Sequence, residues 1–224
     1  MTVLVVAAHP DDETLGCGGA IARHTDAGDT VIVMFLADGV TSRDPDADHA
    51  AELARRRQAA EAAARILGVA DLAFGDLPDN RMDTVPLLEI AQAVELAVAS
   101  YAPTTVYTHH RHDLNVDHRR THEAVMTACR PQPGSTVATI LAFETPSSTE
   151  WRTADPTSAF APTWYVDIGA TLDRKILALE AYAEEMRPWP HPRSTQAVRH
   201  LAHWRGSTVG REAAEAFVLT RHVS

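Results

Sequence analysis

A histidine and three carboxylates follow an apolar segment near the start of the chain. Residues 3–8 read Val-Leu-Val-Val-Ala-Ala, and His9-Pro10-Asp11-Asp12-Glu13 come next. An unbroken apolar run is typical of a strand buried on both faces, and open α/β sheets bind ligands at the carboxyl ends of such strands. Histidine and aspartate bind divalent metals and move protons. This segment therefore predicts a reactive site at the end of the first strand.

A second group of such side chains follows residues 104–108, another apolar segment. This group consists of His109, His110, His112, Asp113, Asn115, Asp117 and His118. If the two strands are neighbours, the two groups converge at one edge of the sheet. Two histidines and one aspartate, with an open position for water, make a sound catalytic zinc site. A carboxylate that is not a ligand can then act as the base that takes a proton from the water.

Simpler interpretations exist for several of these residues. An aspartate at a helix start is often only a cap, which would explain Asp11 or Asp12 but not the whole motif. His118 and His122 have the i, i+4 spacing of a helical metal pair, but Arg119 occupies the position where that motif has glutamate. His109 and His110 fit loop or supporting positions better than ligand positions. Asp117 is a candidate for orienting an imidazole.

The elements that must position these residues alternate between strands and helices. Gly68, Pro103 and Pro131 follow three of the helices as stop signals. Over the first ~145 residues the alternation predicts right-handed crossovers and a mainly parallel sheet flanked by helices. The pattern predicts strands at 2–8, 30–36, 71–74, 104–108, 136–143 and 164–168, helices at 13–27, 48–67, 85–100, 118–129, 171–186 and 194–205, a loop at 40–47 centred on Asp44-Pro45-Asp46, a turn from Gly75 to Arg81, and an apolar segment at 216–219.

Composition narrows the class of protein. The chain has 224 residues, 45% of them hydrophobic, and a formal net charge of -10. No stretch of five or more lysines or arginines occurs, which argues against a nucleic-acid partner, and no apolar run approaches the ~18 residues of a membrane span. No basic segment precedes the first apolar run, so we expect no secretory signal. Two cysteines do not form a disulfide framework, and we expect a cytoplasmic protein.

Both motifs resemble the PIG-L/LmbE-like zinc N-deacetylases. The matching residues are His9 to Glu13 and the segment Asp113-Leu-Asn-Val-Asp117-His118. Further similar segments are Leu67-Gly-Val69, Pro78-Asp-Asn-Arg81, Phe143 to Trp151 and Pro190-His-Pro-Arg-Ser194, so that the resemblance covers most of the chain. It implies one domain over residues 1–224 with a Rossmann-like, mainly parallel α/β fold. It also implies a small-molecule substrate, an N-acetylglucosamine-type sugar or its conjugate, and a homo-oligomer.

The resemblance assigns roles to residues of this chain. His9, Asp12 and His118 match the metal ligands, and Asp11 matches the general base. The chain departs from the family at Asn115, where many relatives have a histidine that polarises the carbonyl or protonates the leaving amine. Asn115 can donate a hydrogen bond to an oxyanion but cannot transfer a proton. The proton donor is therefore open between Asp11 itself, His191 and His112.

Candidates for substrate binding are Arg56, Arg193 and Glu144. Relatives have a substrate-binding arginine near Arg56, although the run Arg55-Arg-Arg57 would also suit a solvated helix face. Arg193 lies with His191 in a proline-rich segment that matches relatives, with a substrate or subunit-interface role. Glu144 precedes hydroxyl-bearing residues that could contact a sugar.

The sequence thus predicts a hydrolase that removes an acetyl group from an N-acetylated amino sugar. Two imidazoles and one carboxylate favour zinc, and iron(II) would also fit. One alternative is a nucleotide-binding Rossmann-type protein without hydrolase activity, because Gly16-x-Gly18 follows the first strand. That motif is incomplete, since Ile21 occupies the third glycine position. Another alternative is a family member that binds metal without catalysis. The acylated sugar is not identified by the sequence.

Overall fold

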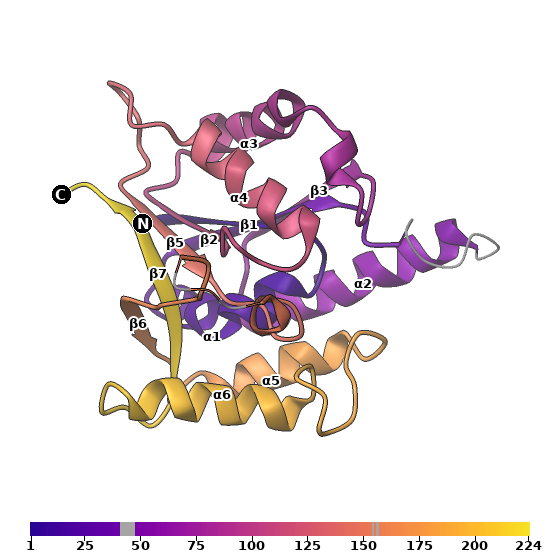
Figure 1. The fold of residues 1–224 in the computed structure, drawn as a ribbon, viewed down its shortest axis with the longest axis vertical. Coiled ribbons are helices and arrows are strands. Elements are labelled where there is room, and N and C mark those ends of the chain that lie inside the picture. The colour runs from indigo at the N-terminus through magenta and orange to yellow at the C-terminus, as the bar shows by residue number, and fades with distance from the viewer. Residues whose placement is uncertain (41–47, 154, 156) are drawn as a thin grey trace.

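One seven-stranded sheet organises the molecule (Figure 1). The structure is a computed structural model, and it describes residues 1–40, 48–153, 155 and 157–224. The strand order is β3-β2-β1-β4-β5-β7-β6; the first five are parallel, and β7 is antiparallel to both of its neighbours. The strands are β1 (Thr2–Ala7), β2 (Thr30–Ala37), β3 (Asp71–Leu77), β4 (Thr105–His109), β5 (Thr139–Phe143), β6 (Trp164–Asp167) and β7 (Ala214–His222). The predicted mainly parallel α/β fold is confirmed.

Helices cover both faces of this sheet. In Figure 1 the helices α3 and α4 lie above it, and α1, α2, α5 and α6 lie below. Two short 3₁₀ helices, at Met82–Thr84 and Thr149–Trp151, lie in loops. The α-helices are α1 (Asp12–Asp26), α2 (His49–Leu67), α3 (Leu87–Tyr101), α4 (Val116–Ala128), α5 (Leu172–Ala181) and α6 (Thr195–Ser207).

Strand β1 lies at the centre of both hydrophobic layers. Val3 and Val5 pack with residues of α1, α2 and α5, whereas Leu4 and Val6 pack with residues of α3 and α4. Successive side chains of a strand point to opposite faces, so a strand covered on both sides needs apolar residues at every position. This explains why the chain begins with an unbroken apolar run.

The sheet brings the two polar motifs together because β1 pairs directly with β4. The register places Val5 opposite Tyr107, so the two strands end side by side. Chain connections leave β1 and β4 toward opposite edges of the sheet, and the order reverses between them. In doubly wound sheets, this reversal opens a crevice at the carboxyl ends of the strands.

Four elements differ from the pattern expected from sequence. Strand β5 begins at Thr139 instead of at 136. Strand β3 continues through Gly75 to Leu77, because Gly75 lacks a Cβ that would collide with the Leu36 carbonyl oxygen. Helix α5 ends at Ala181 instead of continuing to 186. The segment at 216–219 is part of β7, a nine-residue strand inserted between β5 and β6. The predicted loop at 40–47 lies, except for Val40, outside the described residues.

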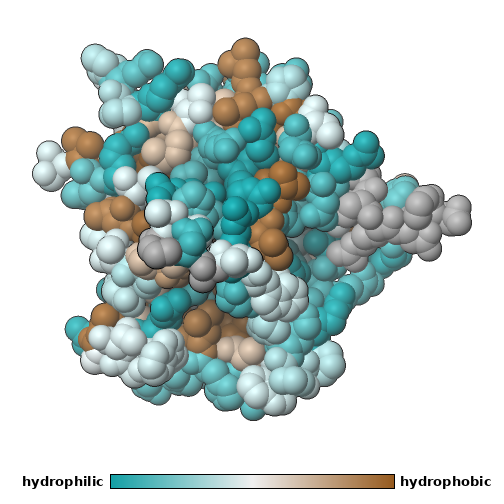
Figure 2. Space-filling view, viewed as in Figure 1, coloured by the Kyte–Doolittle hydropathy of each residue, from teal (hydrophilic) through white to brown (hydrophobic). Residues whose placement is uncertain are grey.

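The surface seen in Figure 2 is mostly hydrophilic, with hydrophobic residues in small separate groups. Among the described residues, no helix combines the length and the apolar character that crossing a membrane requires.

Candidate metal centre

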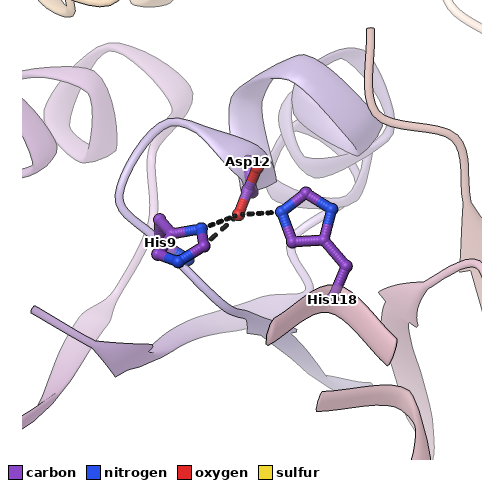
Figure 3. Close-up of side chains that lie close together, drawn as sticks. All are labelled: His9, Asp12 and His118. Atoms are coloured by element: carbon purple, nitrogen blue, oxygen red, sulfur yellow. Dashed lines mark hydrogen bonds and ion pairs between the residues drawn. The ribbon is translucent and has the colours of Figure 1, made fainter. Parts of the chain in front are cut away.

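His9, Asp12 and His118 form a buried cluster at the carboxyl ends of β1 and β4. Their ligand atoms all lie within 4.8 Å of one another. The Oδ2 atom of Asp12 lies 3.2 Å from His9 Nδ1 and 3.2 Å from His118 Nε2. Figure 3 shows the two imidazoles on either side of this carboxylate. The structure thus brings together the three residues that were predicted as metal ligands.

Three buried atoms of this cluster make no hydrogen bond within the described residues: Asp12 Oδ1 and both ring nitrogens of His118. Asp12 Oδ1 is buried and, within the described residues, accepts no hydrogen bond. A buried carboxylate oxygen without a partner is costly, and a bound cation would satisfy it. Two imidazoles and one carboxylate are also the donor set of catalytic zinc sites and suit iron(II). The residues present therefore fit a divalent metal ion.

Carboxylates lie behind both imidazoles. His9 Nε2 is 2.9 Å from Asp117 Oδ2 and 3.0 Å from Asp79 Oδ1, while His118 Nδ1 is 3.0 Å from Asp113 Oδ1. Such a contact places the ring proton on the nitrogen that faces away from the metal and leaves the other nitrogen free to coordinate. The contact to His9 agrees with the hypothesis that Asp117 orients an imidazole.

The electrostatics of the centre favour a cation. Burial raises the pKa of Asp113, but His118 and hydrogen bonds from Ser148 and Thr149 outweigh this and hold that pKa well below its ordinary value. Burial likewise raises the pKa of Asp12, and the charge of His118 with the hydrogen bond from His9 reverses the shift. Four carboxylates surround the two imidazoles His9 and His118: Asp12, Asp79, Asp113 and Asp117. This excess of acidic groups favours binding of a cation.

The sequence interpretation missed specific roles for Asp79, Asp113 and His109. The His109 ring stacks on that of His118 with 3.9 Å between centroids, and its Nε2 accepts the Ala8 N–H at 3.0 Å. Burial, reinforced by the charge of His118, holds the pKa of His109 well below its ordinary value, which keeps this acceptor neutral. The available signal was position: His109 is the last residue of β4, and Asp113 belongs to the matched motif.

Asp11 is not part of the ligand cluster and has a different partner. Its carboxylate is 1% exposed and accepts a hydrogen bond from Arg193 Nη1 at 2.7 Å. Burial raises the pKa of this carboxyl above its ordinary value, and the Arg193 guanidinium opposes the rise without cancelling it. A raised pKa brings a carboxylate closer to that of a useful general base. The direction of this pKa shift agrees with the base role of Asp11, which stays a prediction.

Two arginines form a chain of ion pairs that begins at Asp11. Arg193 Nη1 lies 3.9 Å from Glu185 Oε2, and Arg56 pairs with Glu185 Oε1. Arg56 is buried, and its charge helps to oppose the rise of the Asp11 pKa. Of the two arginines predicted to bind substrate, only Arg193 directly contacts a residue of the motif around the centre.

The remaining predicted site residues are engaged in other contacts. Asn115 Oδ1 accepts the Asp117 N–H at 2.8 Å, and its Nδ2 donates to Asn80 Oδ1 at 2.9 Å. Glu144 accepts two hydrogen bonds from Arg205, at 2.8 and 2.7 Å. His191 Nδ1 accepts the Arg193 N–H at 3.1 Å, and its ring meets the Trp151 ring edge-on. None of these three has a recorded contact with a predicted ligand side chain.

A family model described as PIG-L: GlcNAc-PI de-N-acetylase matches residues 4–129, more than half of the chain. This range contains most of β1, all of β4 and all three residues of the buried cluster.

Relatives cover most of the chain. A protein of Escherichia coli (strain K12) named "Uncharacterized deacetylase YaiS" is 30% identical over 151 residues, which cover 65% of this chain and 75% of that protein. The 4-oxalmesaconate hydratase of Pseudomonas putida is 29% identical over 226 residues, covering 89% and 82%. The structure of N,N'-diacetylchitobiose deacetylase from Pyrococcus horikoshii matches with a TM-score of 0.79 at 21% identity, covering 98% of this chain and 84% of that one. This structural likeness supports the fold.

Proposed function

Because this chain belongs to the PIG-L (GlcNAc-PI de-N-acetylase) family, as its two motifs indicated, we propose that it is a metal-dependent N-deacetylase. Its substrate in this proposal is an N-acetylglucosamine-type sugar or sugar conjugate. The observation that carries the proposal is the buried His9–Asp12–His118 cluster with the separate carboxylate of Asp11 beside it. The three proposed metal ligands and the proposed base thus come from the two motifs at one edge of the sheet.

His9, Asp12 and His118 would hold the metal ion, which we propose is zinc, with iron(II) as the alternative. A divalent ion bound there would act as a Lewis acid that lowers the pKa of water and polarises a carbonyl. Asp79, Asp113 and Asp117 fix the orientation of the two imidazoles through the contacts described above.

Asp11 is the proposed base. It takes a proton from water as the water oxygen bonds to the acetamide carbon. The C–N bond then breaks, the sugar nitrogen receives a proton, and acetate leaves. Asp11 can return the proton it took, and His191 and His112 remain the alternative donors. For His191, the Arg193 N–H bonds its Nδ1 while the Arg193 guanidinium contacts Asp11. Asn115 is proposed to donate its second amide hydrogen to the oxyanion, since the other one bonds Asn80.

Arg193 is the proposed contact for the substrate, because it is partly exposed and bridges Asp11 and Ser147. Arg56 and Glu144 remain predicted substrate-binding residues, and each would first have to leave its ion pair. The homo-oligomer and the cytoplasmic location also remain predictions.

Hydration of an unsaturated carboxylic acid is a second candidate function. The hydratase relative aligns with 89% of this chain. The same groups, a metal site and a base that takes a proton from water, also suit addition of water to a polarised double bond.

Acetate release from a panel of N-acetylated sugars tests the proposal. The protein is prepared metal-free and then loaded with zinc or iron(II), and acetate and free amine are measured together. We expect equal amounts of both from at least one sugar and only with metal. A parallel assay follows the absorbance of unsaturated di- and tricarboxylic acids. Turnover in that assay without acetate release from any sugar would show that the protein is a hydratase and not a deacetylase.

A further inference from the structure

Glu13 is the one carboxylate of the His9–Glu13 motif that the proposed mechanism does not use. It is 3% exposed, although it lies in the first turn of α1 beside the metal centre. The three predicted ligands do not include it. A buried carboxylate at this position needs an explanation, because burying a charge is costly unless it is well hydrogen-bonded.

Three α-helices of this chain begin with a side-chain cap, and α1 does not. Asp48, Asn115 and Ser194 precede helices α2, α4 and α6, and each accepts a backbone N–H with its side chain. Asp11 occupies the same position before α1, and its carboxylate makes no such bond. An aspartate there ordinarily caps the helix. At Asp11 the carboxylate bonds Arg193 instead.

The backbone of Asp11 explains why the cap is missing. Its φ of +123° and ψ of -30° are a conformation that residues with a Cβ rarely adopt. Such strain persists only where surrounding contacts hold it, and it occurs preferentially at functional sites. The conformation leaves the carboxylate free of the helix, as the base role requires.

Glu13 provides the contact that holds this conformation. Its Oε2 accepts the Asp11 N–H at 3.0 Å, and the Asp11 carbonyl accepts the Leu15 N–H at 2.9 Å. The backbone N–H and the carbonyl of Asp11 are thereby both held by hydrogen bonds. Glu13 itself is held by hydrogen bonds to Oε1 from Tyr182 Oη at 2.8 Å and from Thr14 Oγ1 at 2.5 Å. A glutamate that reaches back to the residue before the helix resembles a capping box.

We infer that Glu13, supported by Tyr182, is a positioning residue for Asp11: it caps the start of α1 in place of the Asp11 side chain and holds that carboxylate where it can act as base. This inference rests on the proposed function only in the role it gives to Asp11. Within the described residues Glu13 makes no hydrogen bond to His9, Asp12 or His118, so its effect on Asp11 is exerted through the Asp11 backbone.

The test compares Glu13→Gln, which keeps an oxygen acceptor, with Glu13→Ala, which does not. Tyr182→Phe removes only the supporting hydroxyl, and Glu89→Ala in the first turn of α3 is the matched control. For Glu13→Ala we expect kcat to fall about 100-fold, since small misplacements of a reacting group cost this much. KM and the Kd for zinc should stay unchanged. For Glu13→Gln and Tyr182→Phe we expect a loss of less than about tenfold.

A second measurement does not depend on activity. Amide hydrogen exchange at Asp11, followed by NMR in the folded protein, should accelerate at least about tenfold in Glu13→Ala and stay near the wild-type rate in Glu13→Gln. Unchanged exchange in a folded Glu13→Ala variant would overturn the inference. A zinc Kd that weakens as much as kcat falls, or equal losses in the Gln and Ala variants, would overturn it as well. If the wild type releases no acetate, the proposed function fails, while the exchange rates still decide whether Glu13 holds Asp11.

Discussion

Helices α1 and α4 begin in equivalent places and in different ways. Each follows a strand of the central pair β1 and β4, and each carries a predicted metal ligand in its first turn, Asp12 in α1 and His118 in α4. Helix α4 starts in the ordinary manner, with Asn115 at a φ of -67° and its side chain bonded to the Asp117 N–H. Helix α1 starts at the strained Asp11, which does not cap it.

The difference shows which helix start departs from favourable local geometry in favour of the proposed chemistry. The start of α4 is capped by its own Asn115, which also contacts Asn80, 35 residues away. Its side chains orient the imidazoles. The start of α1 depends on Tyr182 and Arg193, more than 160 residues away, to hold Glu13 and Asp11. Departures from local rules are expected at functional sites. The proposed base lies at the start that departs from them.

Among the variants that test this contrast, Asp11→Asn should have the largest effect on activity. We expect kcat to fall about 10³-fold, because an amide cannot accept the proton, and the zinc content to stay near that of the wild type. Asp48→Asn makes the same exchange at the start of α2 and should leave kcat unchanged. Acetate release and metal analysis measure both. Near-normal turnover of Asp11→Asn would remove Asp11 from the base role.

Replacing Asp113 by Asn tests the metal-orienting role of the α4 side. We expect the Kd for zinc to rise about 10- to 100-fold, because His118 loses the carboxylate that fixes its ring. Competition with a chromophoric chelator measures the affinity. The exposed Asp173→Asn serves as control. An unchanged affinity would show that His118 is held by its stacking on His109 instead.

Removing the cap of α4 should affect stability more modestly. For Asn115→Ala we expect the free energy of unfolding to fall by about 1 kcal/mol, since the Asp117 N–H loses its acceptor. Asn115→Asp keeps an oxygen at that place and should retain most of the stability. Urea denaturation of the metal-free proteins distinguishes the two. Equal losses would mean that the contact to Asn80, not the cap, stabilises this helix start.

His122, one turn beyond His118, should give the smallest effect, a pH dependence of stability. Burial lowers the pKa of His122, whose Nδ1 donates to the His109 carbonyl oxygen. The unfolded chain therefore binds the proton more tightly, and stability contributed by the neutral ring is lost as the pH falls below about 6.5. His122→Asn keeps a donor without titrating.

Unfolding curves of metal-free protein between pH 5 and pH 8 measure this effect. The difference in stability between wild type and His122→Asn should change in favour of the variant toward low pH. His200→Asn, at an exposed histidine, serves as control. A difference that is constant with pH would mean that His122 is not linked to proton uptake on unfolding.

Much of the fold could be predicted from the sequence because its signals are local. The apolar run before His9 requires burial on both faces, and the stop residues after the helices act on their own neighbourhood. The same holds for the residue types in the two motifs, which indicated the family and a metal site. The length of β3 escaped prediction, because Gly75 reads as a turn unless the neighbouring Leu36 carbonyl is known.

The sequence by itself determined which side chains could do chemistry: His9, Asp11, Asp12 and His118 stand in motifs whose residue types permit little else. Only the tertiary structure decided how they are used. It placed β1 beside β4, set Asp117 behind His9, joined Arg193 to Asp11 and locked Arg56 onto Glu185. These pairings join residues more than 100 positions apart. They depend on strand order and side-chain direction, which local patterns do not encode.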